Sequence, residues 1–174
     1  MQILKSILII LISLWFSLIA FMPKEELYYA LEHKLVKDYG IELNEKSIKS
    51  GIFSMDVSDI DVYAEGIKVA HIDSMKFLIT LFFNTLDISD ISLDKNLNTF
   101  LPSSIQEIQK ANITYTITSP LKANISIDGN FGKAKGYVDI NRTLRINFTE
   151  LNNPKKLKYI LKKDDNGWYY ETRF

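Results

Sequence analysis

An uncharged stretch of eighteen residues near the N-terminus constrains this chain more than any other feature. It runs from Ser6 to Pro23, lies between Lys5 and Lys24, and contains nothing more polar than serine. Eighteen residues in a helix extend about 27 Å, close to the thickness of the hydrocarbon layer of a bilayer. The sequence therefore predicts a transmembrane anchor over residues 1–23 and a water-exposed domain over residues 24–174.

A cleaved secretory signal is the alternative interpretation of this stretch. Such signals end with small residues three and one positions before the cut. Here Leu18 occupies the first of these positions and Phe21 prolongs the apolar run, so the pattern favours an uncleaved anchor. Lys24 is followed by two glutamates, which leaves a slight basic excess around Lys5 and places the N-terminus on the cytoplasmic side.

Composition excludes several classes of function. The 174 residues contain 21 basic and 21 acidic side chains, so no basic field exists that would attract nucleic acid. The absence of cysteine excludes disulfides, thiolate metal sites and a cysteine nucleophile. The roughly 150 residues after the anchor suit one domain with its own core.

An amphipathic helix is predicted directly after the anchor, from Lys24 to Asp38, with Pro23 at its start and Gly40 at its end. Its acidic and basic residues are mixed, unlike the basic face of a helix that lies on lipid headgroups. We therefore expect the apolar stripe to pack on the domain rather than lie on the membrane. The stripe consists of Leu27, Leu31 and Leu35, with Tyr28 and Val36 beside them.

From residue 41 onward, apolar residues alternate with a period of two, which indicates strands. The apolar side changes between Val57 and Ile60, which predicts a bulge or a strand break. The sequence at residues 57–62 is weakly similar to that at residues 88–93, and the apolar side changes in the same way in both.

The rest of the chain predicts more strands and two short helices. Segments 67–72 and 75–83 are expected as separate strands, with 77–83 apolar on both faces. A capping box at Ser104 predicts a short helix from Ile105 to about Lys110. An antiparallel meander follows from residue 113 to 148, then a lysine-rich helix after Pro154 and an edge strand from Trp168.

Together these elements predict a mainly β (α+β) protein. We expect an N-terminal transmembrane helix and an amphipathic helix, followed by a curved, mostly antiparallel open β-sheet or partial barrel.

Residues suited to catalysis are few. His33 and His71 have no partner at metal-ligand spacing, and the glycines and serines occur in no phosphate-loop or nucleophile motif. Solvation explains the aspartates, which fall at turns or on the polar side of strands. We predict no catalytic residue, no metal, no cofactor and no enzymatic activity. The aspartates concerned are Asp56, Asp59, Asp61, Asp73, Asp87, Asp90 and Asp94.

The order of these features resembles the type II secretion system protein N family and, more distantly, AsmA-like envelope proteins. The resemblance is carried by the anchor, the helix up to Tyr39-Gly40-Ile41, the segment from Gly51 to Val62, the strand from Ile67 to Ile72 and the apolar run from Phe77 to Phe83. It implies a single-pass protein of the bacterial inner membrane whose C-terminal domain lies in the periplasm. No functional residue can be transferred from it.

Two functions follow from the resemblance. The first is a non-enzymatic component of a secretion or envelope transport apparatus that binds other envelope proteins, with exposed strand edges as one means of pairing. The second is a lipid-binding or lipid-transfer module of the AsmA or lipopolysaccharide-transport anchor type. In it, inward-facing side chains line a groove for acyl chains instead of packing on one another. These side chains are Phe77, Ile79, Leu81, Ile125, Ile127, Ile146 and Phe148.

Overall fold

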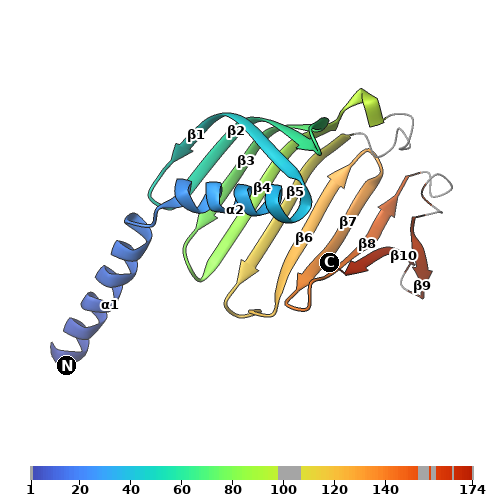
Figure 1. Ribbon diagram of the computed structural model, residues 1–174. Coiled ribbons are helices and arrows are strands. Elements are labelled where there is room, and N and C mark those ends of the chain that lie inside the picture. The colour runs from blue at the N-terminus through green and yellow to red at the C-terminus, as the bar shows by residue number, and fades with distance from the viewer. Residues whose placement is uncertain (1, 98–106, 153–156, 158–159, 166, 174) are drawn as a thin grey trace.

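The computed structural model describes residues 2–97, 107–152, 157, 160–165 and 167–173. Two helices precede a single sheet: α1 spans Gln2–Ala20 and α2 spans Lys24–Tyr39. α1 is long and apolar enough to cross a membrane. It projects away from the sheet, whereas α2 runs alongside it (Figure 1).

The two helices are joined at a sharp bend. Lys24 is buried, and its ammonium group donates a hydrogen bond of 3.0 Å to the carbonyl oxygen of Ile19 in the last turn of α1. The Ile19 carbonyl also accepts the Met22 N–H at 3.3 Å, and a cation at this position complements the negative end of the helix dipole. α2 ends as expected at Gly40, which adopts a left-handed conformation with φ 66° and donates its N–H to the last turn.

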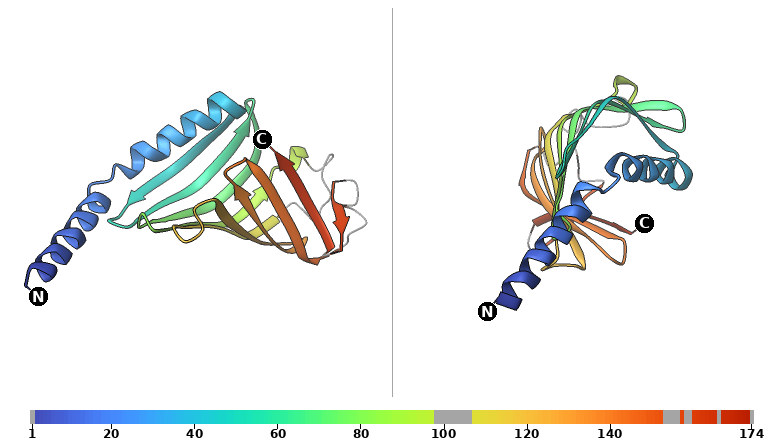
Figure 2. Two further views of the ribbon diagram at one scale, coloured as in Figure 1. Left: turned by 90° about the horizontal axis from the view of Figure 1, so that it is seen from below. Right: turned by 90° about the vertical axis from the view of Figure 1, so that its left-hand side faces the viewer.

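In the described part of the chain, ten antiparallel strands form one open sheet that does not close into a barrel. The strand order is β1-β2-β3-β4-β5-β6-β7-β8-β10-β9, so nearly all neighbours in space are neighbours in sequence. Figure 2 shows that the sheet is strongly curved and that α2 lies on its concave side. The strands are β1 Ile41–Ser50, β2 Ser54–Ala64, β3 Ile67–Ile79, β4 Phe83–Leu93, β5 Glu107–Thr116, β6 Lys122–Gly129, β7 Gly132–Asp139, β8 Thr143–Leu151, β9 Lys162–Asp164 and β10 Gly167–Arg173, with a short 3-10 helix, η1, at Lys95–Leu97.

The predicted change of apolar side in β2 is present, although β2 neither breaks nor shifts its pairing with β3 there. Val57 and Ile60 are three residues apart and both fully buried, while Asp59 between them has a left-handed φ of 59°. Ser58 pairs with Ser74 and Ile60 with Ile72, so the register is kept. The alternation of buried side chains in β3 changes phase at the same position, so the two strands change together which of their residues face the core.

The similarity between residues 57–62 and 88–93 has the same structural basis. In β4, Asp90 lies between Ile88 and Ile91 and has φ 54°, matching Asp59 in β2. Asp is one of the few residues that adopt this conformation at low cost. The Ser-Asp pair that occurs in both strands thus corresponds to one left-handed residue in each strand, which lets both strands follow the curvature of the sheet.

Several expected boundaries were wrong. Segments 67–72 and 75–83 are not two strands, because β3 runs without a break from Ile67 to Ile79 and residues 80–82 form a turn. The predicted helix from Ile105 to Lys110 is strand from Glu107 onward, and its first residues lie outside the described part. β10 is not an edge strand, because β9 pairs with its outer side. Most of the predicted helix after Pro154 also falls outside the described residues.

The stripe on α2 packs only in part. Tyr28 is buried and Leu35 half-buried, but Leu27 and Leu31 are each about half exposed, as is Val36. The inward positions of α2 are shared with polar residues, because Lys24 and Glu32 lie on the same side as Tyr28. Hydrophobic periodicity therefore identified only part of the packed side of this helix.

Candidate functional site: the concave face of the sheet

Cross-strand register places apolar side chains on the concave face from one end of the sheet to the other. Side chains that are directly paired point to the same face, so a row of partners follows the face across many strands. Two such rows cross most of the sheet. The first is Ile48, Val57, Met75, Ile88, Ala111, Ile127, Ala134 and Phe148; the second is Met55, Phe77, Leu86, Ile113, Ile125, Gly136, Ile146 and Tyr170.

α2 covers the N-terminal part of this face. Tyr28 is 3% exposed and packs on a cluster formed by Met55, Val57, Ile60, Ile72 and Met75. Burial, together with the nearby Glu45 carboxylate, raises the pKa of the Tyr28 hydroxyl. This half of the concave face is an ordinary protein core.

The C-terminal part of the face holds a second apolar cluster and a pocket. Phe131, Ala134 and Leu157 are buried there, and Phe131 meets Phe148 edge to face at 5.6 Å between ring centroids. The pocket has a volume of about 260 Å³ and its exposed lining is entirely apolar. It is lined by Ile108, Ile127, Phe131, Ala134, Ile146, Phe148, Leu157, Ile160, Leu161 and Tyr170.

Between the two clusters the concave face is less well covered. Leu86 and Ile88 of β4, which pack against the edge of the cluster under α2, are only partly buried, as are Ile113 of β5 and Ile125 of β6, whereas Ala111 of β5 is buried. On the part of the face that α2 covers, Val57 and Met75 are buried, whereas Ile48 and Phe77 are partly buried. A partly accessible apolar strip therefore crosses β4–β6 in the middle of the sheet and lies beside Ile127 of the pocket lining.

The seven residues predicted to line a groove or a core lie in different environments. Phe77 packs against Tyr28, with ring centroids 6.3 Å apart, and Ile79 lies at the end of β3. Ile125 lies on the open strip. Ile127, Ile146 and Phe148 line the pocket.

Leu81 is the exception, because it does not lie on a strand. It occupies the turn between β3 and β4, with φ 71°, and faces a hollow beside α1. The uninterrupted apolar run from Phe77 to Phe83 hid this turn, since it contains neither glycine nor proline.

Several contributors to the pocket were not among the predicted residues. Ile108 was assigned to a helix, and Phe131 lies in the turn between β6 and β7. The signal for Phe131 was available in the sequence, because it is a large aromatic residue inside a hairpin loop where polar residues are usual.

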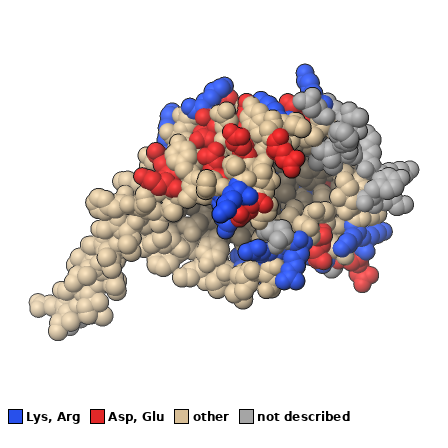
Figure 3. Space-filling view, viewed as in Figure 1, with Lys and Arg blue, Asp and Glu red and all other residues tan. Residues whose placement is uncertain are grey.

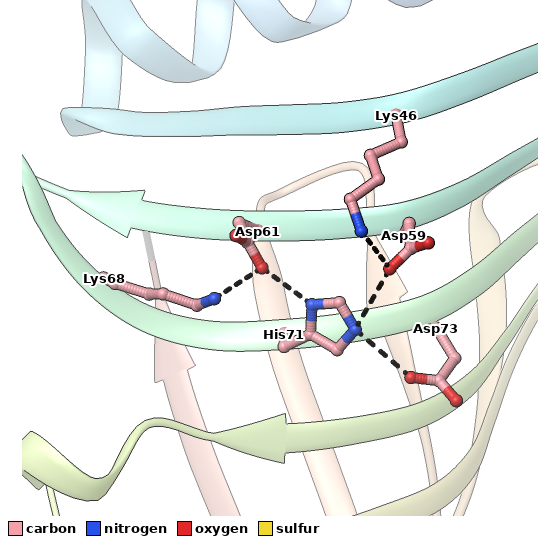
Figure 4. A network of polar contacts seen from close by, with 6 residues as sticks. All are labelled: Lys46, Asp59, Asp61, Lys68, His71 and Asp73. Atoms are coloured by element: carbon pink, nitrogen blue, oxygen red, sulfur yellow. Dashed lines mark hydrogen bonds and ion pairs between the residues drawn. The ribbon is translucent and has the colours of Figure 1, made fainter.

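The convex face carries polar side chains, including a network around His71 (Figure 4). His71 Nδ1 lies 2.7 Å from Asp61, and its Nε2 lies 3.3 Å from Asp73 and 3.7 Å from Asp59. Lys68 is 2.6 Å from Asp61, and this contact and that of His71 hold the pKa of the Asp61 carboxyl below its usual range. The sequence analysis expected each of these aspartates to be solvated separately. The register of β2 and β3 instead brings Asp59, Asp61 and Asp73 together around His71.

Within the described residues, no group of three histidine, cysteine, aspartate or glutamate side chains is arranged to hold a metal ion. The His71 network is a partly exposed set of ion pairs, and such sets contribute little to stability. The concave face has a different chemical capacity, since a surface of methyl, methylene and aromatic groups binds apolar molecules without directional bonds.

No family model, no curated protein and no solved structure matches this chain.

Proposed function

We propose that this protein is a non-enzymatic, membrane-anchored module of the bacterial cell envelope that binds acyl chains on the concave face of its sheet. The observation that carries the proposal is the partly accessible apolar strip of β4–β6, which lies beside the apolar pocket over β6–β8. An acyl chain is long, narrow and apolar, so it suits a surface that extends across several strands and offers no polar partner.

The position of the anchor supports this proposal. α1 is the one described helix that could span a membrane, and a short bend joins it to α2, which packs on the sheet. The concave face is thereby held close to a source of acyl chains. We further propose that the N-terminus is cytoplasmic and that the sheet lies in the periplasm, attached to the inner membrane.

Photocrosslinking in the full-length protein tests the proposal directly. Ile125 and Asn124 are consecutive in β6 and point to opposite faces, so a photoreactive benzoylphenylalanine at each position forms a matched pair. We expect the Ile125 variant, irradiated in native membranes, to form phospholipid adducts detectable by mass spectrometry, and the Asn124 variant to form none. Equal lipid labelling at both positions, or none at Ile125, contradicts acyl-chain binding.

A second function, assembly with other envelope or secretion proteins, is supported by the free side of β1. This ten-residue strand is the first in the sheet order, so its outer edge offers backbone groups to an added strand. The same photoreactive residue at Asn44 in β1 tests this function. Discrete protein adducts at Asn44 without lipid adducts at Ile125 favour assembly over lipid binding.

A further inference from the structure

Four connections at one end of the sheet carry exposed apolar side chains. They comprise residues 51–53, 80–82, 117–121 and 140–142, and they lie at the end from which α1 projects (Figures 1 and 2). Here we call them the tip row. Its exposed side chains, between 52% and 66% accessible, are Ile52, Phe82, Ile117, Leu121 and Ile140, with Phe83, 44% accessible, directly beside them.

The tip row is almost free of charge. Its four connections contain no acidic residue and one basic residue, Arg142. The connections at the opposite end of the sheet include Glu65, Asp94 and Lys95. Figure 3 shows uncharged surface continuing from α1 along the nearby edge of the sheet. Solvent-facing turns normally carry polar residues, so this asymmetry needs a cause.

Contacts with α1 fix the depth of the tip row relative to the proposed membrane span. The indole N–H of Trp15 donates a 3.1 Å hydrogen bond to the carbonyl oxygen of Thr80, and its ring stacks on Phe82 at 6.3 Å. Phe16 meets Phe53 at 5.8 Å. Trp15 lies about 7 Å before the end of α1, given the rise of 1.5 Å per residue. The turns therefore lie beside the last part of the proposed span, in contact with Trp15.

The turn at residues 80–82 is suited to a poorly hydrated layer, because many of its polar groups are paired internally. The Thr80 N–H donates to Asn84 at 2.9 Å, and the Thr80 hydroxyl donates to the carbonyl oxygen of Phe83 at 2.6 Å. The Phe82 carbonyl accepts from Ile117 in the next tip at 2.9 Å, and Leu121 accepts from Ile140 at 3.1 Å. Backbone enters the apolar layer only when its hydrogen bonds are satisfied.

Leu81 provides an independent indication. It adopts φ 71°, a conformation that suits glycine or asparagine and is strained for leucine. Its side chain lines an apolar hollow between the turn and α1 together with Leu14, Leu18 and Phe82. An apolar side chain is thus retained where a polar turn residue would be less strained.

We propose that the tip row inserts into the interfacial layer of the same phospholipid bilayer that α1 crosses. This inference rests on the proposed role of α1 as a membrane anchor. The partner is the lipid surface itself: aliphatic and aromatic side chains enter the boundary of the acyl chains, and Arg142 lies at the level of the phosphates. In this arrangement the strands project from the membrane surface. The apolar strip of the concave face begins at the boundary of the acyl chains.

The absence of cysteine makes a direct test possible. Single-cysteine variants of the full-length chain, Leu121→Cys and Ile140→Cys, are labelled with an environment-sensitive fluorophore and reconstituted into nanodiscs of phosphatidylethanolamine and phosphatidylglycerol. Quenching by lipids that carry a nitroxide on the acyl chain reports insertion. Ile67→Cys is the matched control, because Ile67 is an aliphatic residue, 59% exposed, at the opposite end of the sheet. Leu8→Cys reports on α1.

We expect labels at Leu121 and Ile140 to be quenched several-fold more than the label at Ile67, with the label at Leu8 quenched most. Quenching at Leu8 alone, with Leu121 and Ile140 equal to Ile67, overturns the insertion of the tip row and leaves the anchor intact. Absence of quenching at all four positions overturns both the insertion and the anchor on which it rests.

Discussion

The ring of Tyr28 lies edge-on over the ring of Phe77, with centroids 6.3 Å apart and an interplanar angle of 76°. This contact joins α2 to the concave face across 49 positions of sequence, from residue 28 to residue 77. Tyr28 is the apolar residue of α2 that is fully buried. Tyr28 therefore determines whether α2 covers the N-terminal half of the concave face.

Replacing Tyr28 with alanine should undock α2. Truncation of a buried aromatic residue costs about 3 kcal/mol, so we expect Tyr28→Ala to lower the free energy of unfolding by this amount. Hydrogen exchange should accelerate along α2 while β7 and β8 keep their protection. Tyr28→Phe is the control, because it removes only a long 3.4 Å hydrogen bond to Glu45 and should cost about 1 kcal/mol or less. Similar effects of the two variants would show that packing is not what holds α2.

Replacing Glu32 with glutamine should stabilise the docking of α2 at neutral pH. Burial, followed by the nearby carboxylates of Glu45 and Glu42, raises the pKa of the Glu32 carboxyl. The folded state thus favours the protonated form, and this contribution to stability is present at low pH and lost as the pH rises through the raised pKa. We expect Glu32→Gln to increase stability by about 0.5 kcal/mol at pH 7, the scale of one partly exposed charge interaction.

Denaturation across a pH series measures the Glu32 effect. The gain from Glu32→Gln should vanish below the ordinary carboxyl pKa, where Glu32 is protonated in both states. Glu26→Gln is the control, since Glu26 is on the exposed side of the same helix. A gain that is the same at every pH would contradict the electrostatic explanation.

The His71 network should give the opposite pH dependence at Asp61. Lys68 and then His71 lower the pKa of the Asp61 carboxyl, so its contribution is present at neutral pH and is lost as the pH falls through that lowered value. We expect Asp61→Asn to cause a small loss of stability at pH 7 that disappears in acid. Because the pairs are partly exposed, high salt should reduce the loss, and a salt-independent effect would argue against ion pairing.

Gly136 should not tolerate a side chain. A Cβ at this position would stand 2.1 Å from the carbonyl oxygen of Arg145 in β8, which is backbone and cannot turn away. We expect Gly136→Ala to cost about 2 kcal/mol through forced separation of β7 and β8. Gly51→Ala is the matched control, because its Cβ would first meet the movable hydroxyl of Ser54 at 2.9 Å. Denaturant titration followed by circular dichroism compares the two, and equal losses would contradict the steric explanation.

Local periodicity was sufficient for much of the architecture. The uncharged stretch predicted α1, and Pro23 and Gly40 predicted the limits of α2. Period-two alternation predicted the antiparallel strands and their apolar side, and the change of side at Val57–Ile60 was correctly located. These features depend on residues that are close in sequence, whose backbone geometry fixes the direction of each side chain.

Long-range contacts decided the rest. Periodicity predicted a packed stripe on α2, but of its residues only Tyr28 is buried and Leu35 half-buried, because burial depends on how α2 lies on the sheet. The gathering of Asp59, Asp61 and Asp73 around His71 depends on the register between β2 and β3. The placement of Trp15 against Thr80 depends on how α1 meets the sheet. The sequence by itself determined α1, α2 and most of the strands with their apolar sides, since these follow from neighbouring residues. Only the tertiary structure decided which parts of the apolar face are covered and which turns lie beside α1, because both depend on segments brought together by folding.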